Sequence, residues 1–538
     1  MQRSLSPSQL ILCVAIFICA TANFSFWQAL FTAVNWHEMQ GILFLISQIL
    51  TALSLTVFFI ALFSWHTLLK PACIVFLLAA AVAAYFMDTL GTIINVLMVQ
   101  NIFETDTHEA SELFTAKLAL YVLALGILPS IAVWLVPLRM PRWKTNTGQQ
   151  AFILLISFAI AASTTACVYK QFSIVHRQHK MLRLQLNPVA PILSFIRYFV
   201  EPSASSKNIR MIAADAHQSL TYTKKPHKSL VIFVLGETAR ADNFQLNGYA
   251  RNTNPLLSNY PIINFSNTWS CGTSTAESIP CMFSLLGQDH YSTAKAKSQE
   301  SVLDVLQRAG VSVLWRDNNS DCKGACSRIG MEDVRNAQDA NLCSTGGCFD
   351  GILLKNLEQK ISAMNGDIFI VLHQKGSHGP KYFLRTPPSS KQFQPECEKD
   401  DITDCSHDTI INAYDNTILY TDKLLTDVIE LQKRMSTHYD TAMFYMSDHG
   451  ESLGEQGLYL HGLPYAIAPN EQKHIPFLAW ISPAFSESTG LDIACIKSQA
   501  DNRYSHDNFF HTTLGLLGVQ TTLYQPKLDV FNPCRHNR

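Results

Sequence analysis

The sequence carries almost no net charge and is poor in charged residues. Lys+Arg total 41 and Asp+Glu total 42, so the formal net charge is -1 and the pI is near 7.0. This balance excludes a basic surface of the kind that attracts nucleic acid. Only 15% of the residues are charged, against about 25% in typical soluble domains. At 538 residues, the chain is also too long for one ordinary domain.

The scarcity of charge is concentrated at the start of the chain. Residues 1–100 contain four charged side chains, which are Arg3, Glu38, Lys70 and Asp88. A helix needs about 20 apolar residues to cross a bilayer, and a cleavable signal peptide would explain only the first such run. The sequence therefore predicts a five-helix membrane domain over residues 1–170, with spans near 8–31, 41–65, 71–97, 118–138 and 150–169.

Basic residues in short loops predict the orientation of these spans. With a cytoplasmic N-terminus, one side of the membrane holds Arg3, Lys70, Arg139, Arg142 and Lys144. Five crossings then send the rest of the chain outside, although the basic residues between 170 and 183 disagree with the rule. Residues 171–228 alternate apolar and basic side chains and then become polar. They are predicted to form amphipathic helices on the membrane surface and a linker; a plain spacer helix is the alternative.

Cysteine usage gives independent evidence on the compartment. Four of the 14 cysteines lie in the predicted spans, and the other ten follow residue 270 in close pairs. An even number in pairs indicates disulfides and an oxidising compartment. A zinc ribbon is the alternative, but no C-x-x-C pair repeats. Neighbouring cysteines are predicted to bond as Cys271–Cys281, Cys322–Cys326, Cys343–Cys348, Cys397–Cys405 and Cys495–Cys534.

The soluble part, residues 229–538, alternates short β-rich runs with helical segments. Residues 229–235, 311–315, 367–372 and 441–446 are typical of buried parallel strands, and 301–309 and 415–433 of the helices between them. This alternation predicts a doubly wound α/β domain, which binds ligands at the carboxyl ends of its strands.

Polar side chains follow three of these strands directly. Glu237 comes after the first, His378 lies shortly after the third, and Asp448 and His449 follow the fourth. Each alone would be an ordinary turn residue, but their convergence favours a metal site. Carboxylate and imidazole ligands suit zinc or manganese.

The segment Cys271–Ser278 holds the candidate nucleophiles for that site. It offers three hydroxyls, Thr273, Ser274 and Thr275, ahead of an apolar run. Hydroxyls at a helix N-terminus are usually caps. The predicted Cys271–Cys281 bridge and the affinity of helix N-termini for phosphate favour chemistry instead. A metal would activate the hydroxyl, and the spacing does not choose among the three.

Six long segments of the sequence are chemically distinctive: GETARADNFQLNGYARNTNP from Gly236, SCGTSTAESIPCMFS from Ser270, WRDNNSDCKGAC from Trp315, HQKGSHGP from His373, NAYDNTILYTD from Asn412 and SDHGESLGEQGLYLHGLPYAIAP from Ser447. They resemble the phosphoethanolamine transferases that modify lipid A, a family of the alkaline-phosphatase-like superfamily. The mobile colistin-resistance transferases belong to the same family. The resemblance covers essentially the whole chain.

The resemblance implies a role for individual residues. Thr275 matches the zinc-bound nucleophile that becomes phosphoethanolamine-modified. The resemblance implies one tightly bound zinc and allows for a second. Glu237, Asp448 and His449 match the ligands of the tightly bound zinc. His378 and His461 match residues that bind the second zinc or the phosphoryl group. The donor headgroup site is matched by Ser320, Lys323, Asn101, Thr105 and Glu109. The last two also suit a helix cap and first turn, and Lys323 also suits a solvated lysine.

The activity implied by the resemblance is transfer of phosphoethanolamine from phosphatidylethanolamine to a lipid A phosphate. A monomer in the bacterial inner membrane is expected, with its catalytic domain in the periplasm and polymyxin resistance as the outcome. An acceptor on lipopolysaccharide core sugar or another glycan is the alternative. A sulfatase would need a C-x-P-S-R-type segment, which Cys271–Thr275 lacks. A phosphoglycerol transferase fits the segment from Ser270 less well, and an inactive sensor would not need these residues.

Overall fold

The computed structural model describes residues 4–63, 65–104, 107–200, 209–344 and 347–536. The chain forms two compact units. The first comprises Met1–Gln100 and Phe114–Glu201, and the second comprises Asn101–Leu113 and Pro202–Arg538. Residues 171–200 therefore belong with the apolar helices. The short segment 101–113 belongs with the second unit, although apolar helices flank it in the sequence.

The described part of the first unit consists of helices and their connections, with one isolated β-bridge between Leu5 and Leu138. Its helices are α1 (Pro7–Thr21), α2 (Phe24–Ala33), α3 (Met39–Phe63), η1 (His66–Leu68), α4 (Leu69–Leu90), α5 (Val96–Glu104, whose end enters the second unit), α7 (Ala116–Tyr121), η2 (Val122–Ile127), α8 (Leu128–Leu135), α9 (Trp143–Cys167), α10 (Tyr169–Gln178), α11 (Leu182–Gln185) and α12 (Val189–Val200). Four helical stretches are long and apolar enough to cross a membrane: Met39–Phe63, Leu69–Leu90, Ala116–Leu135 and Thr145–Cys167.

A fifth span results if α1 and α2 count as one helix bent by 63°. Two buried asparagines hold this bend. Asn23 Nδ2 donates to the carbonyls of Ile18 (3.1 Å) and Asn187 (2.7 Å), and Asn187 Nδ2 donates to those of Ala22 (2.9 Å) and Ala80 (2.8 Å). Through these bonds, Asn187 joins the break between α1 and α2 to helix α4.

The third predicted span is shorter in the structure than the sequence indicated. Helix α4 ends at Leu90 rather than near Leu97, because Gly91 takes a left-handed conformation with φ 66°. Its N–H bonds back to the carbonyl of Phe86. Glycine adopts this conformation without the clash that a side chain would cause, which makes it a common helix stop.

The second unit is built on a seven-stranded mixed sheet with the order β3-β14-β10-β2-β9-β5-β6. The four predicted strands are β2 (Lys228–Gly236), β5 (Ser312–Asp317), β9 (Ile368–His373) and β10 (Tyr439–Ser447), and β6 (Gly330–Asp333) extends this parallel set. The sequence did not predict the strands β3 (Ile263–Asn264) and β14 (Phe477–Ile481). Strand β14 runs antiparallel to β10, and the edge strand β3 runs antiparallel to β14. The doubly wound α/β fold is therefore confirmed, with a mixed rather than wholly parallel sheet.

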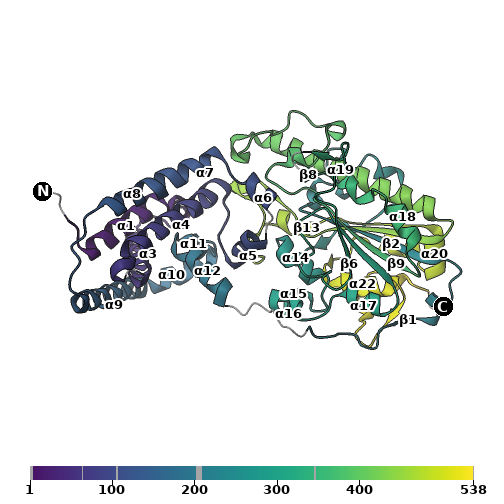
Figure 1. The fold of residues 1–538 in the computed structure, drawn as a ribbon, viewed down its shortest axis with the longest axis horizontal. Helices are drawn as coiled ribbons and strands as arrows, with labels where there is room; N and C mark the ends of the chain where they lie inside the picture. The colour runs from purple at the N-terminus through teal and green to yellow at the C-terminus, as the bar shows by residue number, and fades with distance from the viewer. Residues whose placement is uncertain (1–3, 64, 105–106, 201–208, 345–346, 537–538) are drawn as a thin grey trace. The chain divides into compact units, whose positions relative to one another are not determined.

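Helices cover both faces of this sheet (Figure 1). One face packs on α14 (Thr275–Met282), α17 (Val302–Arg308) and α22 (Asp507–Leu516), and the other on α19 (His407–Met435). The central strands are buried on both sides, which explains why their sequences are continuously apolar.

Smaller elements complete the second unit. The remaining helices of four or more residues are α6 (Thr107–Glu112), α13 (Leu220–Thr223), α15 (Gly287–His290), α16 (Thr293–Lys297), η6 (Asp350–Leu354), α18 (Leu357–Ala363), α20 (Pro483–Thr489) and α21 (Ile493–Ser498). The remaining strands form small sheets: β1 (His217–Gln218) with β16 (Val519–Gln520), β11 (Ser452–Leu453) with β12 (Tyr459–Leu460), β7 (Cys343–Ser344) with β8 (Gly347–Cys348), and β13 (His474–Ile475) with β4 (Thr268–Trp269) and β15 (Tyr504–Ser505).

Candidate active site

The polar residues predicted at the strand ends meet at the centre of the sheet. Strands β10, β2 and β9 are direct neighbours, with Ser447 paired to Gly236 and Leu235 paired to His373. Glu237 and Asp448 therefore leave adjacent parallel strands side by side. The backbone N–H of Asp448 donates to the carbonyl of Gly236 at 3.0 Å, which joins the two turns directly.

Three side chains crowd around one imidazole nitrogen. His449 Nε2 lies 3.3 Å from Asp448 Oδ2, 3.4 Å from Glu237 Oε1 and 3.4 Å from Thr275 Oγ1. Thr275 Oγ1 in turn lies 3.1 Å and 3.2 Å from the two oxygens of Glu237. Tetrahedral zinc has ligands at about 2.1 Å, which puts the ligand atoms about 3.4 Å from one another. The separations between these side-chain atoms match that arrangement.

Two further observations indicate that this cluster suits a cation. Asp448 Oδ2 is buried and has no hydrogen-bond partner among the described residues. His449 Nδ1 lies 2.9 Å from the carbonyl of Gly450, so Nδ1–H donates there and Nε2 faces the carboxylates, where it carries a proton or binds a metal. Glu237, Asp448 and His449 can therefore hold a metal ion together.

The pKa shifts of Asp448 and His449 show that the cluster favours positive charge. Burial, reinforced by the nearby Glu237 carboxylate, raises the pKa of Asp448 to about 7. Burial alone would lower the pKa of His449, but the charges of Asp448 and Glu237 outweigh it and raise that pKa to about 10. Two buried carboxylates side by side thus favour any positive charge placed between them. A divalent cation would supply it.

Thr238 supports both carboxylates and was not recognised from the sequence. Its N–H donates to Asp448 Oδ1 at 3.1 Å, and its hydroxyl donates to Glu237 Oε1 at 2.6 Å. Both bonds require a left-handed backbone with φ 57°, which is rare for a β-branched residue. The hydroxyl of Tyr414 holds this conformation by donating to the carbonyl of Thr238 at 2.8 Å. Strain of this kind concentrates at functional sites.

Among the three candidate hydroxyls, only that of Thr275 faces the metal cluster. Thr275 is the first residue of α14, so its Oγ1 lies at the helix N-terminus, where peptide N–H groups favour negative charge. Thr273 Oγ1 donates to the carbonyl of Leu463 at 2.5 Å. Ser274 Oγ is buried without a hydrogen-bond partner among the described residues.

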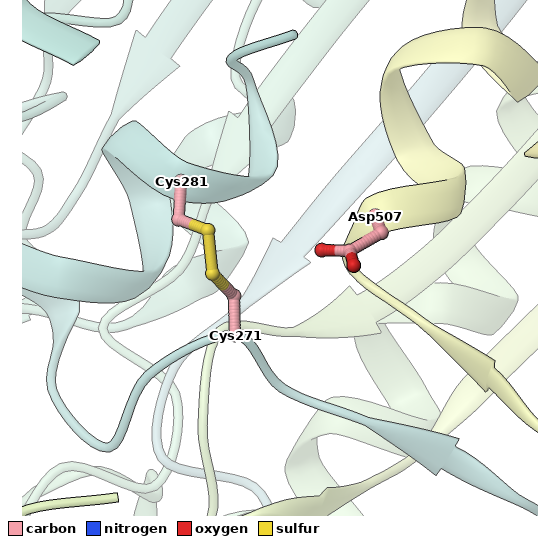
Figure 2. A group of neighbouring side chains, drawn as sticks. All are labelled: Cys271, Cys281 and Asp507. Carbon is pink, nitrogen blue, oxygen red and sulfur yellow. A yellow bond between two sulfur atoms is a disulfide. The ribbon is translucent and has the colours of Figure 1, made fainter. Parts of the chain in front are cut away.

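The loop that carries these hydroxyls is tied to its own helix. Figure 2 shows the Cys271–Cys281 disulfide, which joins the loop before α14 to the helix, and the carboxylate of Asp507 beside it at the start of α22. Asp507 Oδ1 accepts a hydrogen bond from the N–H of Gln288 at 2.9 Å. Because both sulfur atoms are bonded to each other, this group positions the loop and offers no thiolate to a metal.

All five disulfides join the neighbouring cysteines expected from the sequence. They are Cys271–Cys281, Cys322–Cys326, Cys343–Cys348, Cys397–Cys405 and Cys495–Cys534, all in the second unit. The cysteines of the first unit, Cys13, Cys19, Cys73 and Cys167, are free thiols.

A buried network behind Glu237 was also missed from the sequence. Asn319 Nδ2 donates to Glu237 Oε2 at 2.7 Å and lies 3.2 Å from His373 Nε2. His373 Nδ1 lies 2.8 Å from Asp317 Oδ2, and Trp315 Nε1 donates to the same oxygen at 2.8 Å. Asp317 ends β5 and His373 ends β9, so the position of both at the carboxyl ends of strands was the available signal. Nothing in one sequence reveals that they pair.

Two further histidines complete the site. The ring of His461 lies 4.3 Å from that of His449 and 5.4 Å from that of His378, between centroids. His461 Nδ1 lies 2.9 Å from Glu451 Oε2, and Tyr382 donates its hydroxyl to Glu451 Oε1 at 3.0 Å. Burial lowers the pKa of His461. Glu451 therefore holds a neutral His461 with Nδ1 protonated and Nε2 available as an acceptor.

The residues expected at the headgroup site are distributed over two segments. Ser320 and Lys323 follow Asn319, and Lys323 Nζ donates to the carbonyls of Ser320 (2.7 Å) and Glu104 (3.2 Å). Asn101 lies partly buried in α5. Thr105 lies outside the described residues, and Glu109 lies in α6 with its side chain outside them.

The chain resembles known proteins over nearly its full length. Residues 229–519 match the sulfatase family, and residues 52–202 match the family described as phosphoethanolamine transferase EptA/EptB. Phosphoethanolamine transferase EptA of Salmonella typhimurium is 39% identical over 98% of this chain and 96% of its own length. Phosphatidylethanolamine transferase Mcr-1 of Escherichia coli is 39% identical over 96% of each chain.

A solved structure agrees with these sequence matches. The integral membrane protein lipooligosaccharide phosphoethanolamine transferase A from Neisseria meningitidis superposes with a TM-score of 0.94 at 32% identity. The match covers 99% of this chain and 100% of that one. The likeness therefore includes both the helical unit and the α/β unit.

Proposed function

Because the chain belongs to the EptA family of phosphoethanolamine transferases, we propose that it moves phosphoethanolamine from phosphatidylethanolamine to a phosphate of lipid A through Thr275. The protein is a multi-span integral membrane enzyme with a periplasmic catalytic domain. The observation that carries the proposal is the contact of the Thr275 hydroxyl with both Glu237 and His449 at the N-terminus of α14.

Thr275 Oγ1 is proposed to attack the donor phosphorus. The bond from phosphorus to the glycerol oxygen breaks, diacylglycerol leaves with a proton, and phosphoethanolamine stays on Thr275. A zinc ion held by Glu237, Asp448, His449 and the Thr275 oxygen would lower the pKa of this hydroxyl and offset the charge of the phosphoryl group.

The remaining groups bind and orient the phosphoryl group. The peptide N–H groups at the start of α14 face the charge that develops on the phosphoryl oxygens. His461 lies beside His449, and His378 lies beside His461; both can bind those oxygens or exchange a proton with the leaving oxygen. A lipid A phosphate oxygen then attacks the adduct, and Thr275 regains its proton, which predicts ping-pong kinetics.

The proposal is tested by mass spectrometry of lipid A from a polymyxin-sensitive Gram-negative host that expresses the chain. We expect a phosphoethanolamine increment on lipid A and higher polymyxin resistance, because the added ammonium offsets phosphate charge. The same host with an empty vector is the control. Unmodified lipid A with phosphoethanolamine on the core sugar would instead identify the alternative acceptor.

The tautomer of His461 gives a further prediction. Glu451→Gln would put an NH₂ group against Nδ1, so that Nδ1 becomes an acceptor and Nε2 carries the proton. We expect kcat to fall by about 10- to 100-fold, as for other partners that orient a histidine. The measurement is the release of diacylglycerol from phosphatidylethanolamine in mixed micelles.

A matched control for Glu451→Gln exists on the surface. Tyr260 donates its hydroxyl to the exposed Glu430 at 2.7 Å, as Tyr382 does to Glu451. Glu430→Gln should leave kcat unchanged. Full activity in Glu451→Gln would show that the tautomer of His461 does not matter to transfer.

A further inference from the structure

Among the described residues of the second unit, one guanidinium–carboxylate pair is almost fully withdrawn from solvent. Arg385 Nη1 donates to Glu112 Oε1 at 3.0 Å, and Nη2 donates to Glu112 Oε2, so the pair is bidentate. The side chains are 1% and 4% exposed. Burying both charges removes their hydration, and such a pair often stabilises a protein no more than apolar side chains would. We therefore attribute the pair to the positioning of neighbouring groups rather than to the stability of the fold.

The same guanidinium also holds the backbone of a site residue. Arg385 Nε donates to the carbonyl of His378 at 2.7 Å. Three donors of one planar group thus fix the His378 peptide to the Glu112 carboxylate. A lysine cannot reproduce this contact, because its ammonium has no separate donor along the side chain.

The segment that supplies Glu112 has a second attachment at its other end. Glu104 Oε1 pairs with Lys297 at 2.8 Å, and the Glu104 carbonyl accepts a hydrogen bond from Lys323 Nζ at 3.2 Å. Segment 101–113 is therefore attached at Lys323 and, through Arg385, at His378. The proposed function places His378 at the phosphoryl group, and the family resemblance implies that Lys323 lies at the donor headgroup.

We propose that Arg385 is a positioning residue, which uses the buried pair with Glu112 to hold His378 in place for the reacting phosphoryl group. This inference rests on the proposed function, because it needs His378 at the transfer site. Displacement of a positioned group by about 1 Å can cost 100-fold in rate. The effect should therefore appear in kcat rather than in KM.

A double-mutant cycle tests the inference in the full-length protein. Arg385→Lys and His378→Ala are made singly and together, and the release of diacylglycerol from phosphatidylethanolamine in mixed micelles is measured. We expect Arg385→Lys to lower kcat by about 10- to 100-fold. In the His378→Ala background, Arg385→Lys should lower kcat by less than about threefold, because the effects of residues that act through one another are not additive.

The matched control is a bidentate pair on the surface. Arg335 donates to both carboxylate oxygens of Asp333, at 3.0 Å and 2.6 Å, and the side chains are 29% and 38% exposed. Arg335→Lys should leave kcat unchanged in both backgrounds. If Arg385→Lys does not fold, as judged by its melting transition, Glu112→Gln replaces it in the cycle.

Two results would overturn the inference. One is an unchanged kcat in Arg385→Lys, and the other is a loss that multiplies in full with that of His378→Ala. A wild-type protein that releases no diacylglycerol would instead contradict the proposed function, so the two failures are distinguishable.

Discussion

Replacing Thr275 by alanine is expected to abolish both the covalent adduct and the modification of lipid A. The methyl group of alanine leaves no oxygen beside Glu237 and His449, and the other two hydroxyls of the loop do not face the cluster. Loss of a nucleophile typically removes several kcal/mol of transition-state stabilisation, so transfer should fall by at least about three orders of magnitude. Intact mass spectrometry of the protein and of lipid A measures both effects.

The Thr275→Ala protein should remain folded. Glu237 keeps hydrogen bonds from Thr238 Oγ1 at 2.6 Å and Asn319 Nδ2 at 2.7 Å, so no buried carboxylate loses all its partners. Thr275→Ser is expected to retain part of the activity, since it keeps the hydroxyl but loses the β-branch that restricts its rotamer.

Ser278→Ala is the matched control for Thr275→Ala. Ser278 lies in the same helix, is fully buried, and its hydroxyl has no hydrogen-bond partner among the described residues. Its removal should leave transfer unchanged. Lipid A that is still modified by Thr275→Ala would show that a different hydroxyl, or no protein hydroxyl, accepts phosphoethanolamine.

Much of the catalytic fold could be predicted because local sequence determines it. The run from Ser229 to Leu235 is apolar without interruption, as a strand buried on both faces must be, and it becomes β2. Parallel strands end at one edge of the sheet, so Glu237 and Asp448 could be expected together before their distance was known. Strand β14 was missed because FLAWI is a short apolar run, and periodicity does not distinguish a buried strand of this length from a buried helical segment.

The rest of the site depends on contacts between distant parts of the chain. Arg385 and Glu112 are 273 residues apart, and neither stands in a motif with a chemical signature. The left-handed backbone of Thr238 follows from its two bonds to Glu237 and Asp448 and not from its own preference. A single sequence therefore indicates which residues carry the chemistry. It does not show which residues hold them in place.

Replacing Asp448 by asparagine should raise the melting temperature of the metal-free protein and lower that of the zinc-bound protein, each relative to the wild type. Without metal, Asp448 and Glu237 are two buried carboxylates side by side, which disfavours the folded state. Asparagine removes one charge and keeps an oxygen for the N–H groups of Thr238 and His449. The metal-free variant should therefore melt at a higher temperature than the metal-free wild type.

With zinc, the wild type should melt at a higher temperature than Asp448→Asn. A ligand present at a thousand times its Kd stabilises the folded state by about 4 kcal/mol, and only the wild type keeps the full set of ligands. Melting of the full-length protein in detergent, followed by tryptophan fluorescence with zinc or with chelator, measures this crossing. Phosphoethanolamine transfer by Asp448→Asn should fall by about three orders of magnitude, because the metal contributes several kcal/mol to phosphoryl transfer.

Asp422→Asn separates the metal effect from general removal of a buried carboxylate. Asp422 is fully buried in α19 and accepts the N–H groups of Leu256 and Leu257 at 2.9 Å and 3.1 Å. Burial raises its pKa to about 6. Its replacement should change the melting temperature equally with zinc and with chelator, because no metal depends on it. A wild-type protein whose melting temperature and transfer rate ignore zinc and chelator alike would show that Glu237, Asp448 and His449 do not hold a metal that the reaction needs.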